Sequence, residues 1–270
     1  MKRTADILLM AEYHGLYLSD RDCDILDLVA DHRFLRADQI RRLHFADLGT
    51  EPARARACSR VLRRLAAAKL IRLVERRVGG VKRGSAAGVW CLGPVGYRVM
   101  KRVRVRVTRP HEFGRPEFLE HTLAIAEARV RLVEASRAGQ FELAKVQLEP
   151  DAWRGFPGPL GAPLSLRPDI FVITAAGDYE THWFVEIDRG TESMPRITKK
   201  CARYQAHFQS GIEQATHGVY PVVQWVVPDR RRAESVRRVI DEDQNLESQI
   251  FRVVIEDEFI AEITAETTST

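Results

Sequence analysis

Apolar residues recur at helical spacing in the first part of the chain. Residues 22–32 place them three and four positions apart, which is typical of an amphipathic helix. Residues 37–44 repeat this spacing over a second short segment. A Gly-Thr-Glu-Pro sequence then interrupts the pattern, and Pro52 favours the first turn of a third helix, where a missing N–H costs nothing. The pattern predicts three short helices in succession.

The third predicted helix has two chemically different faces. At about 100° per residue, small and apolar side chains gather on one face and arginines on the other. No acidic residue occurs between Pro52 and Val74, so the basic face lacks the ion pairs that exposed helices usually carry. A solvated surface and a nucleic-acid contact are both open interpretations. The arginines that we predict to contact DNA are Arg54, Arg56, Arg60, Arg63 and Arg64.

Two strand-like segments follow, at residues 70–77 and 89–92. The loop between them is rich in Gly, Lys, Arg and Ser and contains Lys82 and Arg83. Three short helices and a hairpin with a basic tip predict a winged helix-turn-helix. In that fold the third helix enters the major groove and the hairpin lies over the backbone or the minor groove. A winged helix that contacts only proteins is the alternative.

From residue 117 to residue 135 the apolar spacing is again helical, and shorter apolar runs follow. The order of helix, three strands, helix and strand predicts a mixed sheet covered by helices. The fold class is therefore α+β or α/β in two domains, residues 1–109 and residues 110–270. The predicted strands are residues 141–148, 167–173, 183–187 and 222–227, and the later helices are residues 196–208 and 231–242.

Composition adds a separation of charge to this picture. The net charge of +5 over 270 residues conceals a basic first part and an acidic second part. Residues 1–109 hold 24 Lys and Arg against 11 Asp and Glu, whereas residues 110–270 hold 18 against 26. Such segregation is typical of a nucleic-acid-binding module joined to a domain with another partner.

The remaining composition excludes several classes of protein. The four cysteines are far apart and form no CxxC motif, which favours buried free thiols over disulfides or a zinc site. No apolar run approaches the roughly 20 residues of a membrane span, and the first residues hold no signal-peptide core, so we expect a cytoplasmic protein without membrane partners. P-loop, GxGxxG, HExxH and HxH motifs are absent.

Three carboxylates stand where strands are predicted to begin or end. Asp169 follows a proline at a strand start, and Glu186 and Asp188 close the next strand. Alternation places Glu186 and Asp188 on one face, and hairpin pairing can bring Asp169 within reach of both. Converging carboxylates suit Mg²⁺ or Mn²⁺, so all three are candidate metal ligands. The alternative is a turn at residues 188–190 with a local ion pair.

Four motifs together carry a resemblance to a known family. They are His121-Thr122-Leu123-Ala124, Arg167-Pro168-Asp169, the block Glu-Ile-Asp-Arg-Gly-Thr-Glu at residues 186–192, and Lys200-x-x-x-Tyr204. Over roughly residues 20–240 the chain resembles the replication-relaxation family of bacterial plasmid and mobile-element proteins. The resemblance implies an N-terminal winged helix, a second domain like the PD-(D/E)xK nucleases, and a role in plasmid replication, DNA relaxation or transfer.

The nuclease resemblance assigns roles with one departure. Asp169 and Glu186 match its metal-binding acids, but Asp188 occupies the position of its lysine. A carboxylate cannot stabilise the negative charge that builds up on a phosphate, so Lys199 or Lys200 would have to supply the cation from the neighbouring helix. Glu117 or Glu120 can complete the set of acidic residues at the site. For Lys200 and Tyr204 the alternative is a pair of surface side chains that only pack against each other. The candidate catalytic residues are Asp169, Glu186, Asp188, Lys200 and Tyr204.

Two functions follow from the sequence. The first is a double-stranded-DNA-binding protein of a plasmid or integrative element that acts in replication, relaxation or conjugative transfer. Its second domain is then either a divergent Mg²⁺-dependent endonuclease or an inactive, DNA-handling relic of one. The second is a non-catalytic winged-helix regulator or accessory factor whose second domain mediates assembly. Relaxosome or replication proteins and a second copy of the chain are the expected protein partners.

Overall fold

A computed structural model describes residues 2–13, 15–74, 88–104, 107, 116–158 and 161–268. The chain separates into two compact units, Met1–Val130 and Arg131–Thr270. This division falls inside a helix, α6, that begins in the first unit. The domain boundary predicted after residue 109 stays a prediction, since most of residues 105–115 lie outside the described part.

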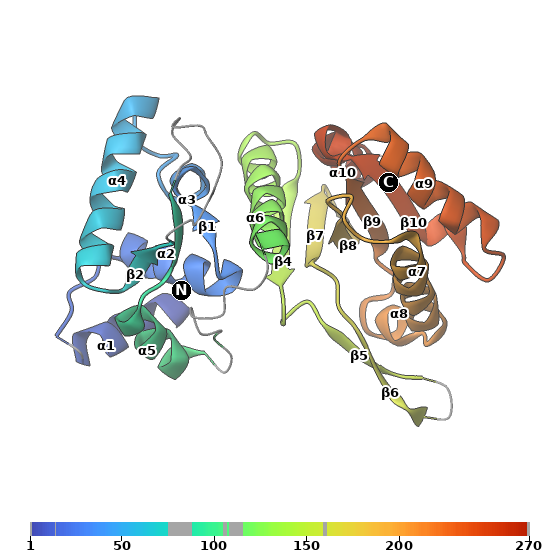
Figure 1. Cartoon of the computed structure of the whole chain (residues 1–270), viewed down its shortest axis with the longest axis horizontal. Helices are drawn as coiled ribbons and strands as arrows, with labels where there is room; N and C mark the ends of the chain where they lie inside the picture. Colours follow the sequence, from blue (N-terminus) through green and yellow to red (C-terminus); the bar gives the residue numbers. More distant parts are fainter. Residues whose placement is uncertain are drawn as a thin grey trace. The chain divides into compact units, whose positions relative to one another are not determined.

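Unit 1 contains the three predicted helices and a strand in each of the two predicted segments (Figure 1). Of the strand predicted at residues 70–77, Ile71–Leu73 is a strand and residues 75–77 lie outside the described part. Helices α1, α5 and the two-residue strand β1 complete the unit, and the three strands pair antiparallel in the order β1-β3-β2. The elements are α1 (Lys2–Tyr13), α2 (Asp20–His32), β1 (Leu35–Arg36), α3 (Ala37–His44), α4 (Glu51–Ala67), β2 (Ile71–Leu73), β3 (Val89–Leu92), α5 (Pro94–Val103) and α6 (Pro116–Arg137).

Local chemistry explains where these helices begin. The Ser19 hydroxyl accepts a bond from the Asp22 N–H, and the Asp22 carboxylate accepts one from the Ser19 N–H, which forms a capping box at the start of α2. At α5, a Cβ on Gly96 would collide with the carbonyl oxygen of Leu70. Only glycine therefore lets α5 approach the segment that leads into β2.

A partly buried carboxylate on α6 ties together the elements around α3. Glu127 accepts hydrogen bonds from Arg36 (3.0 Å), Gln39 (3.0 Å) and Arg42 (2.5 Å), and Gln39 also donates to the carbonyl of Leu123 (3.0 Å). Burial by itself would raise the pKa of Glu127, but the bonds from Gln39 and Arg42 and the neighbouring positive charges outweigh it and lower that pKa.

Unit 2 is built on a mixed five-stranded sheet within its described residues, as the sequence pattern predicts. The strand order is β10-β9-β8-β7-β4, in which β8, β9 and β10 run parallel and β7 and β4 pair antiparallel. The elements are β4 (Glu142–Leu148), β5 (Arg154–Pro157), β6 (Pro163–Leu166), β7 (Ile170–Ala176), β8 (Tyr179–Ile187), α7 (Met194–Gln209), α8 (Ile212–His217), β9 (Val222–Val227), α9 (Arg230–Glu242), η2 (Ser248–Ile250), β10 (Phe251–Ile255), η3 (Glu256–Glu258) and α10 (Phe259–Thr268).

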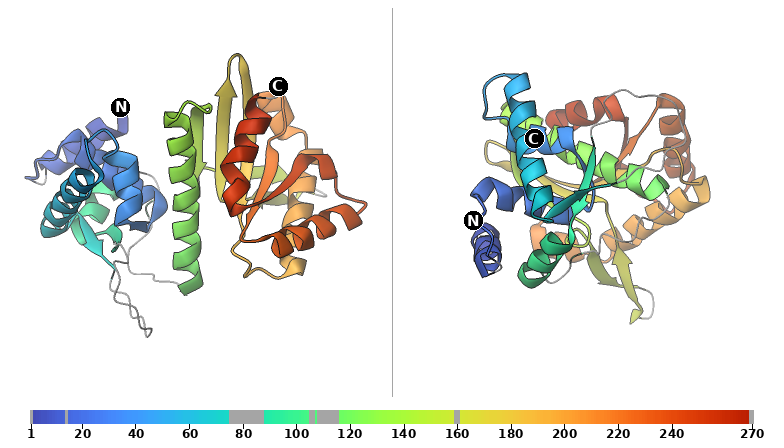
Figure 2. Two further views of the ribbon diagram at one scale, coloured as in Figure 1. Left: turned by 90° about the horizontal axis from the view of Figure 1, so that it is seen from above. Right: turned by 60° about the vertical axis from the view of Figure 1, so that its left-hand side comes forward.

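Several elements of unit 2 differ from the sequence prediction. The strand predicted at residues 167–173 begins only at Ile170, since Pro168 cannot donate a ladder hydrogen bond. The hairpin of β5 and β6 has no counterpart in the predicted pattern and extends away from the main sheet (Figures 1 and 2). Strand β10 and helices α8 and α10 were likewise not predicted from the sequence pattern.

The sheet of unit 2 is packed on both faces. On one face, Phe184 and Trp225 join Tyr204 of α7 and Val236 of α9 in a fully buried cluster. On the other, the Trp183 ring nitrogen donates to the Thr174 hydroxyl at 2.9 Å, and that hydroxyl lies 2.7 Å from the Thr267 hydroxyl of α10. Such bonds satisfy polar groups that burial would otherwise leave unpaired.

Two smaller expectations can be compared with the structure. All four cysteines are buried free thiols, which confirms the sequence-based interpretation. Among the described helices, none is long and apolar enough to cross a membrane.

Replacing Glu127 by alanine should destabilise unit 1. Arg36, Gln39 and Arg42 would lose their shared acceptor, and leaving partly buried donors unpaired costs about 2 kcal/mol. Thermal and urea unfolding of the full chain measure this loss. Glu12→Ala removes an exposed helical carboxylate in the same unit and should leave unfolding unchanged. Equal unfolding curves for the two variants would contradict the role given to Glu127.

Candidate functional site

Helix α4 presents a basic face to solvent. Arg56, Arg60 and Arg63 are exposed, whereas Leu62 and Leu65 on the same helix are buried. Within the described residues, none of these three arginines forms an ion pair with a carboxylate, and Arg63 donates only to the carbonyl of Ser59. The amphipathic division expected for this helix is present, with three guanidinium groups available to an external anion.

The other predicted DNA contacts differ from these three. Arg54 is partly buried and donates to the carbonyl of Leu48 at 2.6 Å, which holds the α3–α4 connection. Arg64 forms an ion pair with the buried carboxylate of Asp22 at 2.5 Å. Both arginines therefore have internal partners. Lys82 and Arg83 lie outside the described residues.

Glu186, at the end of β8, is a buried acidic residue of the predicted catalytic set. It is 2% exposed, yet one carboxylate oxygen lies 2.9 Å from the Lys200 ammonium and the other accepts a bond from the Tyr204 hydroxyl at 2.6 Å. Lys200 and Tyr204 are one turn apart on α7, so a single helical face supplies both partners. Lys200 also lies 3.0 Å from a Glu192 oxygen and 5.5 Å from the centre of the Trp225 ring.

Burial and charge shift the proton affinities of this cluster. Burial raises the pKa of Glu186 to about 7, because desolvation outweighs the attraction of Lys200, and the Asp169 charge raises it further. Burial by itself would lower the pKa of Lys200, but the carboxylates of Glu186 and Asp169 hold it above its usual range. Burial also raises the pKa of Tyr204 well above 10, so this hydroxyl keeps its proton.

The other two predicted acids lie beside Glu186 but have different partners. Asp169 precedes β7 and accepts a bond from the Ile187 N–H at 2.8 Å, as the hairpin pairing predicts. Asp188 accepts a bond from the Gly190 N–H at 2.9 Å and forms a buried ion pair with Arg232 of α9. The ion pair of Asp188 is thus formed with a residue 44 positions further along the chain, and not with a local partner as the alternative interpretation expects.

The arrangement also bears on the predicted metal ligands, Asp169, Glu186 and Asp188. Within the described part of the chain, no three or more His, Cys, Asp or Glu side chains are placed to hold one ion. Both oxygens of Glu186 and both of Asp188 accept hydrogen bonds from other residues. Mg²⁺ and Mn²⁺ require several oxygens directed at one point, so the residues as arranged do not fit these ions. The metal site stays a prediction.

Comparison with known proteins assigns this chain to one family. The model of the replication-relaxation family matches residues 26–223, which is most of the chain. The chain belongs to the replication-relaxation family. No curated protein and no solved structure shows significant similarity to it. The segment that this replication-relaxation protein shares with the family contains the α4 arginines, Asp169, Glu186, Lys200 and Tyr204, and ends before Arg232.

Sequence reasoning missed two partners of the buried cluster in this replication-relaxation protein. Arg232 pairs with Asp188 across 44 residues, and no spacing rule connects a strand end to a later helix. Trp225 lies in a strand that is apolar except for Gln224, where an aromatic residue indicates only burial. Glu192 is different, because it closes the 186–192 block that carries the family resemblance. Its contact with Lys200 gives that part of the block a physical role.

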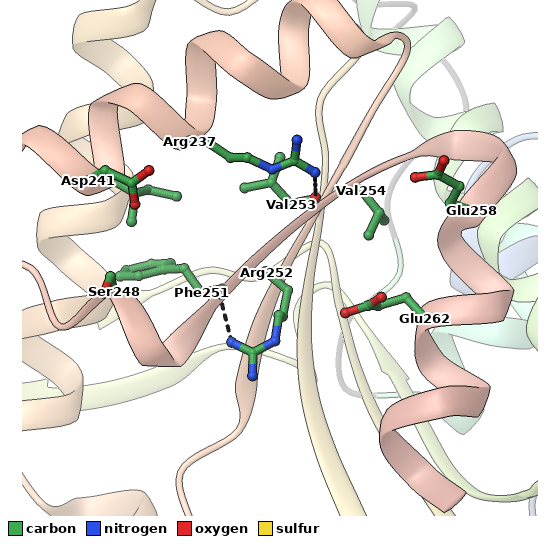
Figure 3. Close-up of a pocket in the computed structure, with 10 residues that line it drawn as sticks. Arg237, Asp241, Ser248, Phe251, Arg252, Val253, Val254, Glu258 and Glu262 are labelled. Carbon is green, nitrogen blue, oxygen red and sulfur yellow. Dashed lines mark hydrogen bonds between the residues drawn. The ribbon is translucent and has the colours of Figure 1, made fainter. Parts of the chain in front are cut away.

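A separate cavity of about 380 Å³ lies between α9, β10 and α10 (Figure 3). Arg237 and Arg252 line it, and both donate to backbone carbonyls, of Val253 and Phe251 respectively. Glu258 and Asp241 add opposite charge. None of the predicted site residues lines this cavity. Its two arginines bind backbone carbonyls of β10, the strand at the edge of the sheet.

Glu186→Gln should remove a pH dependence of stability. The pKa of Glu186 is near 7 in the folded state against 4.5 ordinarily, so the folded chain binds this proton more tightly than the unfolded chain. Stability should therefore fall as the pH rises through this interval, by up to about 3 kcal/mol for the wild type. Thermal unfolding from about pH 5 to pH 8 tests this, since Gln does not titrate. Superimposable profiles of wild type and Glu186→Gln, with Glu142→Gln as the exposed control, would disprove it.

Proposed function

We propose that this replication-relaxation protein binds double-stranded DNA through α4 in the replication or relaxation of plasmid or mobile-element DNA. The observation that supports it is the row of exposed arginines on α4, namely Arg56, Arg60 and Arg63, without carboxylate partners among the described residues. From the first to the last of them the helix rises about 10 Å, which is comparable to the roughly 12 Å width of the major groove.

The elements around α4 support this placement. The order α2, β1, α3, α4, β2, β3 and the antiparallel sheet β1-β3-β2 support the winged helix-turn-helix interpretation. In that fold α4 would be the recognition helix, whereas the predicted contacts of Lys82 and Arg83 fall outside the described residues. Figures 1 and 2 show α4 along one side of unit 1.

A second candidate function is cleavage of a DNA strand by unit 2. One observation favours it, because Lys200 reaches from α7 to Glu186 and so supplies a cation that Asp188 cannot. An ammonium group held in a buried setting stabilises negative charge that develops on a phosphate. If unit 2 does not cleave DNA, we propose that it serves assembly with replication or relaxosome proteins or with a second copy.

Removing the α4 arginines should weaken DNA binding and flatten its salt dependence. Each phosphate that the protein no longer neutralises lowers the slope of log affinity against log salt by about 0.9, so Arg56→Gln, Arg60→Gln and Arg63→Gln together should lower it by up to about 2.7. Fluorescence anisotropy with a labelled duplex measures the slope.

The matched control for this triple variant removes three exposed cations from α5, Arg98, Lys101 and Arg102. It changes the net charge equally, so a smaller effect of the control assigns the contact to α4. Equal slopes for the two triple variants would overturn the proposal, because bulk charge alone would then explain the binding.

The cleavage candidate predicts that Lys200→Gln slows the nicking of supercoiled plasmid. Loss of a charge-stabilising group typically lowers the rate about 10²–10³-fold. Lys145→Gln is the matched control, since Lys145 is an exposed lysine of the same unit away from the predicted site. Gel electrophoresis separates supercoiled from open-circular plasmid. Absence of nicking by the wild type, or equal nicking by the Lys200 variant, would reject this candidate.

A further inference from the structure

Two connections of unit 2 meet at one edge of its sheet. Strands β8 and β9 are parallel neighbours with Ile187 opposite Val226, so their carboxyl ends lie side by side. The Asp188 N–H donates to the Val226 carbonyl at 2.9 Å and extends this contact by one residue. Ligands of α/β sheets commonly bind at such carboxyl ends.

Specific contacts fix the two connections against each other. Asp188 pairs with Arg232, which also donates to the Glu192 carbonyl at 2.6 Å. Gly190 has a φ of +76°, and a Cβ there would contact the Pro228 ring at 3.4 Å. Arg189 lies between Asp188, which contacts Val226 of β9 and Arg232 of α9, and Gly190, which lies against Pro228. It is therefore held beside the start of α9.

Exposed cations surround this edge. Arg196, in the first turn of α7, keeps a side chain that is 70% exposed despite a weak contact with Glu192 at 3.7 Å. Acids within the two connections are occupied internally, since Glu192 faces Lys200 and the Asp229 carboxylate caps α9. We define the basic rim as Arg189, Arg196, Lys199, Arg230 and Arg231, all of which are exposed.

Helices α7 and α9 add a favourable field for anions. Both begin at this edge, at Met194 and at Arg230, and the amino end of a helix carries about half a positive charge. The rim also contrasts with the rest of the unit. Residues 239–270 hold nine Asp and Glu against one Arg, so the basic rim contrasts with the acidic last part of the chain.

We propose that the basic rim is a second contact surface of this chain for the phosphate backbone of DNA. Several exposed cations with two helix amino ends suit a ligand with repeated negative charges, and a phosphodiester backbone offers one about every 3.4 Å per strand. The proposal takes DNA as its ligand from the proposed function, but its residues are all in unit 2. It places DNA phosphates next to the buried Glu186 and Lys200.

The test uses the full chain and a short labelled DNA duplex over a range of KCl concentrations. Arg189→Gln with Arg230→Gln should lower the salt slope by up to about 1.8, which corresponds to two phosphate contacts. The matched control, Arg137→Gln with Lys145→Gln, removes two exposed cations that do not adjoin these strand ends and should keep the wild-type slope. Equal slopes for the rim variant and the control would overturn the proposal.

Two further variants keep the test decisive. Arg189→Lys with Arg230→Lys retains the charges and should preserve the wild-type slope, so a loss here would indicate a structural effect and overturn the proposal. Combining the rim variant with the α4 triple variant separates the two surfaces. If only the α4 change lowers the slope, the rim proposal fails and the proposed function stands. If only the rim change lowers it, the placement of DNA on α4 fails and the rim stands.

Discussion

The site in unit 2 depends on neutralising two carboxylates at the buried end of β8. Glu186 is paired with Lys200 and Tyr204 of α7, and Asp188 is paired with Arg232 of α9. Burying an unpaired charge costs several kcal/mol, so these pairs require both helices to lie on the same face of the sheet. One pair of acids two residues apart thereby fixes the starts of α7 and α9. The geometry of the basic rim is a consequence of this constraint.

The two units differ in where their acidic and basic side chains lie. In unit 1 the carboxylates of Asp22 and Glu127 bind arginines from neighbouring segments, and this leaves three arginines of α4 to solvent. In unit 2 nine Asp and Glu lie in residues 239–270, whereas the exposed cations of the basic rim flank the β8 and β9 ends. A polyanion therefore meets favourable charge at a defined helix face in one unit and at a defined sheet edge in the other.

Residue patterns were informative where an element's own side chains determine it. The spacing of apolar residues predicts α2, α3 and α4, and the short apolar runs predict β8 and β9 with the bounds of β9 correct. Pro168 explains why β7 begins later than predicted. Elements such as β1, with two residues, and α10, a short helix against the far face of the sheet, carry too little periodic signal of their own, and tertiary packing determines them.

By itself, the sequence determined the arginine face of α4, the alternation that puts Glu186 and Asp188 on one face, and the one-turn spacing of Lys200 and Tyr204. These are local properties, because the helical and strand periods fix them. Only the tertiary structure decided that Glu186 pairs with Lys200 while Asp188 pairs with Arg232, 44 residues away. The physical reason is that a buried charge takes whichever cation the packing of helices brings within reach, and no local period encodes that choice.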